Sequence, residues 1–322
     1  MTVIIPGSQR ALKVTGPGQF QVSLANEIPT IADDEVLVKV VAVAINPIDG
    51  KSAELSPTAG ATSGCDFAGS VVQLGSNITK PLKLGDRVCA CIFGNNPERL
   101  DNGAFSEFVA VPADLVLKIP DSMSYQTAAT LGVAVATVGM ALYYSLKLPS
   151  GFSPIAICSP RNYDLVKSLG AIATFDYHSP SCGSEIHDFT NDTLVYALDC
   201  IADTSSMTIC YKAIGSAGGH YLSLDPFPIR CHTRRSIKPN WISTLTMFNQ
   251  AVNWQIGYRK EAKPKDRAFG HEWFKTAQEL LDNGHVKPHP FKEMTGGLDG
   301  IVDGIAQVRK SEVSAMKLVY TI

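Results

Sequence analysis

The stretch IAICSPRNYDLVKSLGAIATFDY (155–177) decides the fold class of this chain. Two apolar runs of strand length, IAIC (155–158) and ATFDY (173–177), enclose a segment in which Ser159-Pro160 suits the start of a helix and Gly170 its end. The apolar stripe of that helix is formed by Leu165, Val166 and Leu169. A strand, a helix and a second strand joined by short connections predict a parallel α/β sheet.

The alternation continues toward the C-terminus. LVYALDC (194–200) and HYLSL (220–224) are strand-like runs on either side of a helix that ends before Gly215. The apolar positions of this helix are Met207, Cys210, Tyr211 and Ile214. We therefore expect a doubly wound parallel sheet. Two more helical faces precede the strand-like MKLVYT (316–321): Trp273, Phe274, Ala277, Leu280 and Leu281 in one, and Ile301, Val302, Ile305 and Val308 in the other.

The first 120 residues predict β-structure instead. EVLVKVVAVAIN (35–46) is rich in Val, and its Lys39 is compatible with a strand that reaches water on one side. Turn-forming segments rich in Gly and Asp then separate three more runs of strand length: FAGSVVQL (67–74), DRVCACIF (86–93) and AFSEFVAV (104–111). Strands at this spacing predict a small antiparallel barrel or sandwich.

Length and composition favour a two-domain enzyme. The chain has 322 residues, of which 45% are hydrophobic and 18% charged, so a substantial core can form and disorder is excluded. The formal net charge is −2, and no basic run is longer than Arg234-Arg235. These charges argue against nucleic acid as a partner.

Three features bear on the compartment. The start, MTVIIPGSQRALKV, lacks the basic head and apolar region of a secretory signal. The apolar stretch 128–144 lies at the lower limit for a membrane span, and we expect it to be a buried helix between domains. The eight cysteines are irregularly spaced without a C-x-x-C pair, which excludes a zinc ribbon. We predict a cytoplasmic monomer that binds neither membrane nor nucleic acid.

The order of a β-barrel, a parallel α/β unit and a short αβ tail resembles the medium-chain dehydrogenase/reductase family. The stretches that match its pattern are AVAINPIDGK (42–51), GCDFAGSVVQLGS (64–76), GDRV (85–88), GAFSEFV (103–109) and AATLGVAVATVG (128–139). The resemblance implies a discontinuous GroES-like catalytic domain, residues 1–124 and 285–322. It also implies a Rossmann NADP-binding domain, residues 125–284.

A narrower resemblance is to the fungal trans-acting enoyl reductases. It is carried by CSPRNYDLVKSLGA (158–171), FDYHSP (175–180), YALDCI (196–201), AIGSAGGHYLSLDPFP (213–228) and VSAMKLV (313–319). Those enzymes serve polyketide synthases of the lovastatin type and hybrid polyketide–peptide synthetases. The resemblance implies NADPH-dependent reduction of an α,β-unsaturated polyketide thioester held by such a synthase, in secondary metabolite biosynthesis.

The zinc ligands of the alcohol dehydrogenases in this family are missing. Those enzymes carry a Cys near the position of Asn46-Pro47 and a His within G-H-E, where this chain has Gly64-Cys65-Asp66. Tetrahedral zinc needs three or four converging ligands, which Cys65 alone cannot supply. We predict no metal, and we expect Cys65 to be core packing. Hydride addition to a conjugated C=C, with a carbonyl polarised by protein donors, remains the natural chemistry.

The end of the strand 155–158 indicates the cofactor. An NAD enzyme of this fold usually has Asp or Glu at the end of its second strand, whereas Ser159 and Arg161 suit a 2′-phosphate. The alternative makes Ser159-Pro160 a helix cap and Arg161 a solvated residue. We favour NADPH. By resemblance, its contacts are Ile48, Asp49, Gly50, Lys51, Cys158, Ser159, Pro160, Arg161, Tyr177, Leu224, Asp225, Val313 and Ser314.

The resemblance also implies catalytic and substrate-lining residues. Lys51 and Thr137 are the catalytic candidates, although Lys51 could equally be a solvated loop lysine. No His or Cys stands out as a proton donor, and in this family the proton can come from solvent. The substrate-lining candidates, which could equally be core, are Thr137, Val138, Gly139, Met140, Ala141, Leu142, Tyr143 and Tyr144, and Thr244, Leu245, Thr246, Met247 and Phe248.

One unit of the nucleotide domain is absent. A strand, a Gly-rich turn and a helix that binds the pyrophosphate should precede IAIC, but Leu148-Pro149-Ser150 runs directly into Gly151-Phe152. The gap has the size of one strand–helix unit of about 30 residues. Gly215–Gly219 lies between a helix and a strand, so we expect a turn there and not a phosphate loop. Loss of a central strand should expose apolar surface on its neighbours.

Two explanations of this gap compete. The sequence is a mis-spliced or mis-predicted version of a complete enzyme, which we favour, or it belongs to a degenerate relative that no longer binds NADPH tightly. Three functions follow as hypotheses: a trans-acting enoyl reductase, a non-catalytic docking partner of the synthase, or a stand-alone zinc-free quinone or alkenal reductase.

Overall fold

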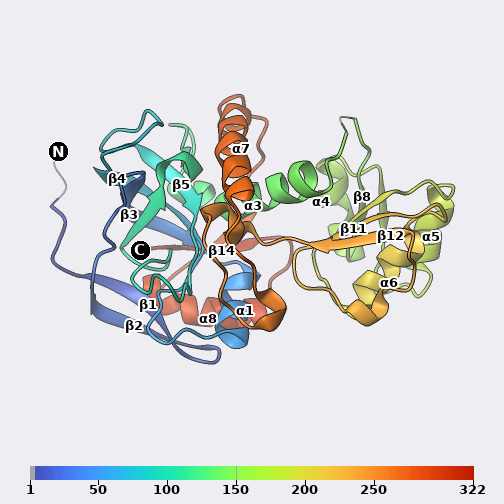
Figure 1. Cartoon of the computed structure of the whole chain (residues 1–322), viewed down its shortest axis with the longest axis horizontal. Coiled ribbons are helices and arrows are strands. Elements are labelled where there is room, and N and C mark those ends of the chain that lie inside the picture. Colours follow the sequence, from blue (N-terminus) through green and yellow to red (C-terminus); the bar gives the residue numbers. More distant parts are fainter. Residues whose placement is uncertain (1–3, 150) are drawn as a thin grey trace. The chain divides into compact units, whose positions relative to one another are not determined.

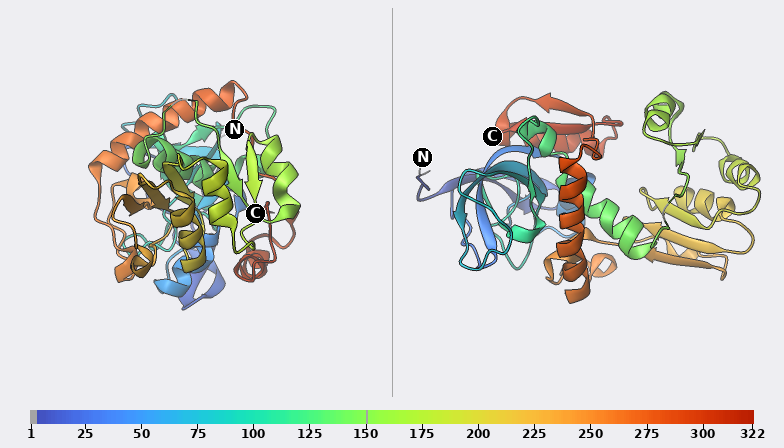
Figure 2. Two further views of the ribbon diagram at one scale, coloured as in Figure 1. Left: turned by 90° about the vertical axis from the view of Figure 1, so that its right-hand side faces the viewer. Right: turned by 90° about the horizontal axis from the view of Figure 1, so that it is seen from above.

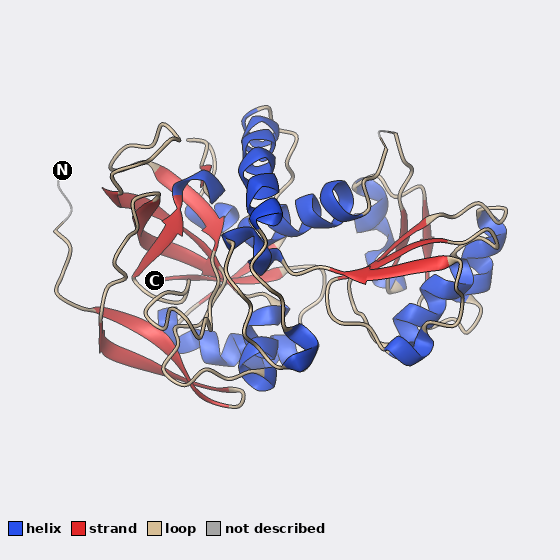
Figure 3. Cartoon of the chain, viewed as in Figure 1, coloured by secondary structure: helices blue, strands red, loops and turns tan. Residues whose placement is uncertain are grey.

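The protein divides into two compact units in the computed structural model, which describes residues 4–149 and 151–322. Unit 1 comprises Met1–Thr137 and Thr244–Ile322, and unit 2 comprises Val138–Ser243. Strands dominate unit 1, whereas unit 2 has short strands separated by helices (Figures 1 and 3). The predicted α/β fold class is confirmed, and the predicted domain bounds stay a prediction.

Unit 1 is built on one mainly antiparallel sheet with the strand order β13-β14-β3-β4-β5-β7, and β6 also pairs with β3. A separate hairpin joins β1 and β2. The strands are β1 (Gln9–Gly16), β2 (Gln19–Asn26), β3 (Glu35–Ala44), β4 (Asp66–Leu74), β5 (Arg87–Cys91), β6 (Phe108–Pro112), β7 (Leu117–Lys118), β13 (Phe291–Met294) and β14 (Lys317–Thr321). The antiparallel β-structure predicted for the first 120 residues is thus confirmed.

Strand β3 forms the centre of this sheet. Its Val-rich sequence is buried almost throughout, and Lys39 is its single exposed residue, as the sequence predicted. Gly69 on β4 lies so close to the backbone of Lys39 that a Cβ there would overlap its carbonyl oxygen. Glycine is therefore required where the two strands approach each other.

The end of the chain returns to unit 1. Val319 and Tyr320 of β14 pair antiparallel with Ala44 and Val43 of β3, which confirms the expected return of the tail. Strand β13 pairs parallel with β14 and was not predicted. Its sequence, Phe-Lys-Glu-Met, is short and half charged, so it carries no alternation that could indicate a strand.

The helices of unit 1 cover the sheet. They are α1 (Pro47–Leu55), the 3-10 turns η1 (Ala113–Leu115), η5 (Thr244–Phe248) and η6 (Ile256–Tyr258), and the helices α2 (Tyr125–Ala128), α3 (Gly132–Val138), α7 (Pro264–Asp282) and α8 (Gly297–Arg309). Helix α7 is tied to β7, because Gln278 accepts from the amide of Lys118 (2.7 Å) and donates to its carbonyl (3.1 Å). Trp273 donates to the carbonyl of Val135 on α3 (2.9 Å).

These contacts place α7 in unit 1. The sequence had assigned 125–284 to the nucleotide-binding domain, whereas residues 125–137 and 244–284 group with the barrel. The apolar face of α7 buries Trp273, Phe274, Ala277 and Leu281 as expected, while Leu280 is partly exposed. Its partners could not be foreseen, because periodicity shows that a face is buried and not what covers it.

Unit 2 contains five parallel strands in the described part of the chain. Its elements are the π-helix η2 (Gly139–Ser145), β8 (Ile155–Ile157), η3 (Pro160–Asn162), α4 (Tyr163–Ser168), β9 (Ala173–Phe175), α5 (Cys182–Phe189), β10 (Tyr196–Asp199), α6 (Thr204–Ala213), β11 (Gly219–Ser223), η4 (Ile229–Cys231) and β12 (Ile237–Trp241). The strands and helices predicted over 155–224 are all present. Helix α5 and strand β12 were not predicted.

The parallel sheet of unit 2 is divided. β8 pairs with β9, and β10, β11 and β12 form a second sheet, with no pairing between the two among the described residues (Figure 2, right view). The larger sheet has a core cluster around Met207, Tyr211, Ile214 and Tyr221.

The long apolar stretch is helical. Tyr125–Ser145 is long and apolar enough to cross a membrane by length and composition, with a mean hydropathy of 1.4. However, 56% of that window is buried within the protein, and core helices of this kind pass the same test. The predicted buried helix is present as α2, α3 and η2 in succession.

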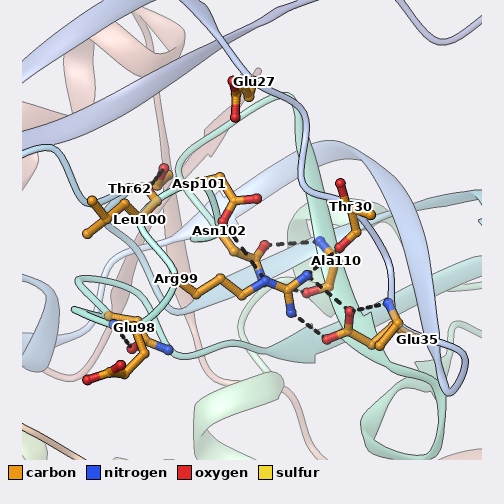
Figure 4. Close-up of polar contacts among 12 residues, drawn as sticks. Glu27, Thr30, Glu35, Thr62, Glu98, Arg99, Leu100, Asp101, Asn102 and Ala110 are labelled. Atoms are coloured by element: carbon orange, nitrogen blue, oxygen red, sulfur yellow. Dashed lines mark hydrogen bonds and ion pairs between the residues drawn. The ribbon is translucent and has the colours of Figure 1, made fainter.

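A polar cluster at the edge of the sheet holds the loop 95–102 against β3 (Figure 4). Arg99 makes two hydrogen bonds to the Glu35 carboxylate (2.6 and 3.0 Å) and one to the carbonyl of Thr30 (2.7 Å). Asn102 bonds both backbone groups of Ala110 (2.8 and 3.0 Å). The Glu35 side chain is only 7% exposed, so water does not replace a lost partner.

We expect Arg99→Met to destabilise unit 1 by about 2–3 kcal/mol, since it leaves a buried carboxylate without its cation. Urea unfolding followed by the fluorescence of Trp254 and Trp273, in a Trp241→Phe background, measures this change. The control is Arg10→Met, which removes an exposed pair with Asp299 and should cost less than about 0.5 kcal/mol. Equal losses in both variants would contradict the assignment.

Candidate active site

Helix α1 carries the first group of predicted site residues. Asn46 precedes the helix, Pro47 occupies its first position, and the Asp49 carboxylate accepts the backbone N–H of Asn46 (2.7 Å). This bond satisfies one of the donors that a helix start leaves free. Asp49 is thereby fixed inside unit 1 with 1% of its surface exposed.

A buried carboxylate centre, which we define as Asn46, Asp49, Cys65, Asp66 and Lys317, lies beside this helix. Asp66 has no exposed surface and accepts three hydrogen bonds: from the Asn46 amide (2.9 Å), from Lys317 Nζ (2.5 Å) and from the backbone N–H of Val133 (2.6 Å). Lys317 also donates to the carbonyl of Thr130 (3.2 Å). The negative charge of Asp66 is therefore paired and fully hydrogen-bonded.

Gly132 makes the contact between α3 and this centre possible. A Cβ at Gly132 would overlap the backbone of Ala90 and approach the Asp66 carboxylate to 2.6 Å. With glycine there, the start of α3 comes close enough for the Val133 N–H to reach Asp66.

The second carboxylate of the centre has an unusual proton affinity. Burial raises the pKa of Asp49 from its ordinary value to about 7, while the amide of Asn46 and the neighbouring Cys65 thiol partly offset this effect and the charge of Asp66 adds to it. Burial also raises the pKa of Cys65, with the charge of Asp49 as the next cause. Cys65 is consequently a neutral thiol and not a nucleophile, in agreement with its expected packing role.

The donor set of the centre does not suit a metal ion. Among the residues that the structure describes, no group of three or more His, Cys, Asp or Glu side chains converges on one point. Asp66 is already engaged by Lys317, whose ammonium group supplies the positive charge at this position.

The remaining candidates of unit 1 lie on α1 and before β14. Lys51 and Ile48 are half-buried on α1, and Val313 and Ser314 are half-buried between α8 and β14. Gly50 faces α8, where its Cβ position lies 3.0 Å from Arg309 Nε, and its carbonyl accepts from Arg309 (3.1 Å). Helix packing therefore accounts for this glycine, and its cofactor contact stays a prediction.

The candidates of unit 2 follow the carboxyl ends of three parallel strands. Cys158–Arg161 follow β8, Tyr177 comes after β9, and Leu224 and Asp225 follow β11. The Ser159 hydroxyl makes no helix-cap bond and instead donates to the hydroxyl of Tyr177 (3.2 Å). Ligands of open parallel sheets bind at this edge, so the position suits a nucleotide.

The residues of unit 2 fit only one end of NADPH. Two hydroxyls, Ser159 and Tyr177, are brought together beside the exposed Arg161, a donor set that suits a 2′-phosphate. A Gly-rich turn that could hold the pyrophosphate is not found in the described part of unit 2. Gly215–Gly219 forms the turn between α6 and β11, as predicted, and Gly218 adopts a positive φ there.

The predicted substrate-lining segment around Thr137 has a feature that the sequence did not indicate. Helix α3 ends at Val138, and the backbone continues as the π-helix Gly139–Ser145. Widened helical turns of this kind occur frequently at functional sites. Thr137 is half-buried, while Val138 and Tyr143 are exposed.

The second predicted substrate segment lies in the core of unit 1. Leu245, Met247 and Phe248 are buried, and Met247 lies against Gly270 of α7, where a Cβ would meet its terminal methyl at 2.7 Å. Thr246 is also buried and donates to Asp266 (2.5 Å). This burial agrees with the alternative that the segment is core, and its substrate contact stays a prediction.

Sequence reasoning missed the carboxylate centre. Asn46-Pro47 followed by Asp49 is a helix-start signal that would have predicted α1 and its buried Asp49. Lys317 lies 251 residues beyond Asp66, and no local pattern connects the two.

The raised pKa of Asp49 predicts a pH dependence of stability. The folded state binds a proton more tightly than the unfolded chain, so stability is lost as pH rises from about 4 to about 7, by at most about 1.4 kcal/mol per pH unit. Asp49→Asn keeps an acceptor for Asn46 and removes this slope. The difference between the unfolding free energies of wild type and variant, measured from pH 4.5 to 8, should change across this window. A constant difference would contradict the assignment.

Comparison with known proteins identifies the family to which this chain belongs. Residues 32–121 match the alcohol dehydrogenase GroES-like domain. The trans-enoyl reductase apdC of Emericella nidulans is 54% identical over 331 residues, covering 99% of both chains. The trans-enoyl reductase opdC of Penicillium oxalicum is 46% identical over 359 residues, covering 99% of this chain and 98% of the relative. Both alignments are longer than the 322-residue chain, so these relatives contain residues without a counterpart here.

Solved structures agree in fold. The CurK enoyl reductase has a TM-score of 0.76 at 16% identity, covering 98% of this chain and 99% of the other. The JamJ enoyl reductase in its apo form has a TM-score of 0.75 at 17% identity, with the same coverage. Given the fold, the GroES-like match and full-length relatives at 54% and 46% identity, the chain belongs to the trans-enoyl reductases, within the medium-chain dehydrogenase/reductase family.

Proposed function

We propose that the protein is a trans-acting enoyl reductase that uses NADPH to reduce the α,β-unsaturated thioester of a growing polyketide on a carrier domain of a partner synthase. The observation that carries the proposal is the full-length relationship to the trans-enoyl reductase of Emericella nidulans at 54% identity. The reaction is assigned to the cytoplasm as part of the same proposal. In support, all eight cysteines are free, as is usual in a reducing compartment.

The chain's own residues have separate tasks in this proposal. Ser159, Tyr177 and Arg161 hold the 2′-phosphate and select NADPH over NADH. Lys51 donates toward the thioester oxygen, where negative charge develops as the β-carbon is reduced. NADPH supplies the hydride when it is bound. The proton that is added to the α-carbon comes from solvent, because Asp49 on α1 and the neighbouring Cys65 are both buried within unit 1.

One observation favours a second candidate function. The described part of unit 2 lacks a phosphate loop, and its sheet is divided between β8 and β10. A chain that binds NADPH weakly could still dock on the synthase as a non-catalytic partner. Tight binding of NADPH by the 322-residue chain, seen as enhanced cofactor fluorescence, would exclude this candidate.

The direct test is the oxidation of NADPH in the presence of an enoyl-pantetheine thioester. We expect turnover, and we expect Lys51→Met to lower kcat/KM by at least about tenfold through kcat, since the lost donor acts on charge that develops in the transition state. The matched control is Lys275→Met on the exposed face of α7, which should leave kcat/KM unchanged. Turnover of free quinones but not of the thioester would contradict the proposal.

The choice of NADPH gives an independent prediction. Arg161→Ala should weaken NADPH binding about tenfold and leave NADH binding unchanged, because a charged contact to the 2′-phosphate contributes about 1.4 kcal/mol. Titration of cofactor fluorescence measures both affinities. Arg230→Ala, which removes another exposed arginine of unit 2, is the control. Equal losses for both cofactors would show that Arg161 does not contact the 2′-phosphate.

A further inference from the structure

One arginine at the end of α8 contacts three separate parts of unit 1. Arg309 donates to the carbonyl of Gly18 in the turn between β1 and β2 (3.0 Å) and to the carbonyl of Gly50 on α1 (3.1 Å). Its Nε forms an ion pair with Glu54, also on α1 (2.9 Å). Its Cζ lies 5.5 Å from the centre of the Phe20 ring on β2. The donors of arginine lie in one rigid plane, which lets a single side chain make all of these contacts together.

Two glycines leave the space that the Arg309 side chain occupies. A Cβ at Gly50 would lie 3.0 Å from Arg309 Nε, and a Cβ at Gly18 would lie 3.3 Å from one of its terminal nitrogens. Gly18 also has a φ of +66°, in the left-handed region that favours glycine. Both distances are shorter than ordinary van der Waals contacts, so a larger residue at either position would displace the guanidinium group.

Arg309 holds one face of α1. Gly50 and Glu54 are four residues apart, so they lie one above the other on the same side of this helix. Helices α1 and α8 lie side by side in unit 1 (Figure 1). The turn that Arg309 contacts is bonded to α1 as well, because the N–H of Gly18 donates to the carbonyl of Ala53 (2.9 Å). Arg309 therefore fixes the rotation of α1 about its own axis.

The rotation of α1 decides where Lys51 is directed. Lys51 follows Gly50, and successive residues of a helix are turned by about 100°, so Lys51 lies on a different face from the one that Arg309 holds. Side chains reach about 5–6 Å from the helix axis, so a rotation of about 10° moves them by about 1 Å. A displacement of about 1 Å at a reacting group can cost about a hundredfold in rate.

We infer that Arg309 is a positioning residue for Lys51: by fixing the rotation of α1, it directs the Lys51 ammonium group toward the thioester oxygen of the substrate. The inference rests on the proposed function, in which Lys51 donates to that oxygen. Arg309 acts only through α1, since its own donors are engaged by Gly18, Gly50 and Glu54.

The test is a double-mutant cycle of Arg309→Met and Lys51→Met in the full chain, with NADPH and an enoyl-pantetheine thioester. We expect Arg309→Met to lower kcat at least about tenfold and to change both KM values by less than about twofold, because Lys51 acts on charge that develops in the transition state. In the Lys51→Met background, the same substitution should lower kcat by less than about twofold, since no ammonium group is left to direct. An arginine that only stabilises the fold would give the same loss in both backgrounds.

The matched control is Arg10→Met, which removes an exposed ion pair with Asp299 at the other end of α8 and should change kcat by less than about twofold. We expect α1 to stay folded in Arg309→Met, because the Asp49 carboxylate still accepts the N–H of Asn46 at its start. Hydrogen exchange of the α1 amides checks this. Arg309→Lys keeps the positive charge without the plane of donors, and it takes the place of Arg309→Met in the cycle if α1 unfolds.

A second measurement needs no turnover. Acetic anhydride acetylates lysine amines, and mass spectrometry gives the rate at the half-buried Lys51 relative to the exposed Lys275. A helix that is free to rotate exposes Lys51 more often, so this ratio should rise at least about threefold in Arg309→Met and stay constant in Arg10→Met.

The inference is overturned by equal losses of kcat in the two backgrounds, by a comparable loss in Arg10→Met, or by an unchanged acetylation ratio. A parent chain that does not reduce the thioester, although the ratio rises in Arg309→Met, would refute the proposed function and leave the effect of Arg309 on Lys51 standing.

Discussion

The ion pair between Asp66 and Lys317 is the interaction on which unit 1 depends. Asp66 opens β4 and Lys317 opens β14, and the same carboxylate binds the amide of Asn46 before α1 and the backbone of Val133 on α3. Four segments that are far apart in the sequence therefore meet at one buried charge. Because a buried carboxylate is stable only when it is paired and hydrogen-bonded, none of these segments can move without leaving it unsatisfied.

This arrangement also indicates that the main role of the buried carboxylate centre is to hold the fold of unit 1 together. The carboxylate of Asp66 already accepts hydrogen bonds from three donors, one of them an ammonium group. The positively charged group at this point is a lysine from the last strand. The return of the tail to unit 1 is thus enforced by charge as well as by the pairing of β14 with β3.

Whether a feature could be predicted from the sequence depends on how far apart the interacting residues lie along the chain. The strands and helices over 155–224 were predictable because turn residues and apolar periods repeat within a few residues. The partners of α7, the π-helix at Gly139–Ser145 and the pairing of Asp66 with Lys317 were not. Each of these depends on contacts between distant segments, for which a single sequence carries no local signal.

A nucleotide-binding domain has both a preference between cofactors and an affinity for them, and the two properties depend on different parts of the sheet. The groups that we propose to distinguish NADPH from NADH, Ser159, Arg161 and Tyr177, follow the paired strands β8 and β9. The groups that bind the pyrophosphate common to both cofactors belong at the start of a helix that follows a central strand. Under the proposed function, a described part of unit 2 without such a turn binds both cofactors more weakly and keeps the preference between them.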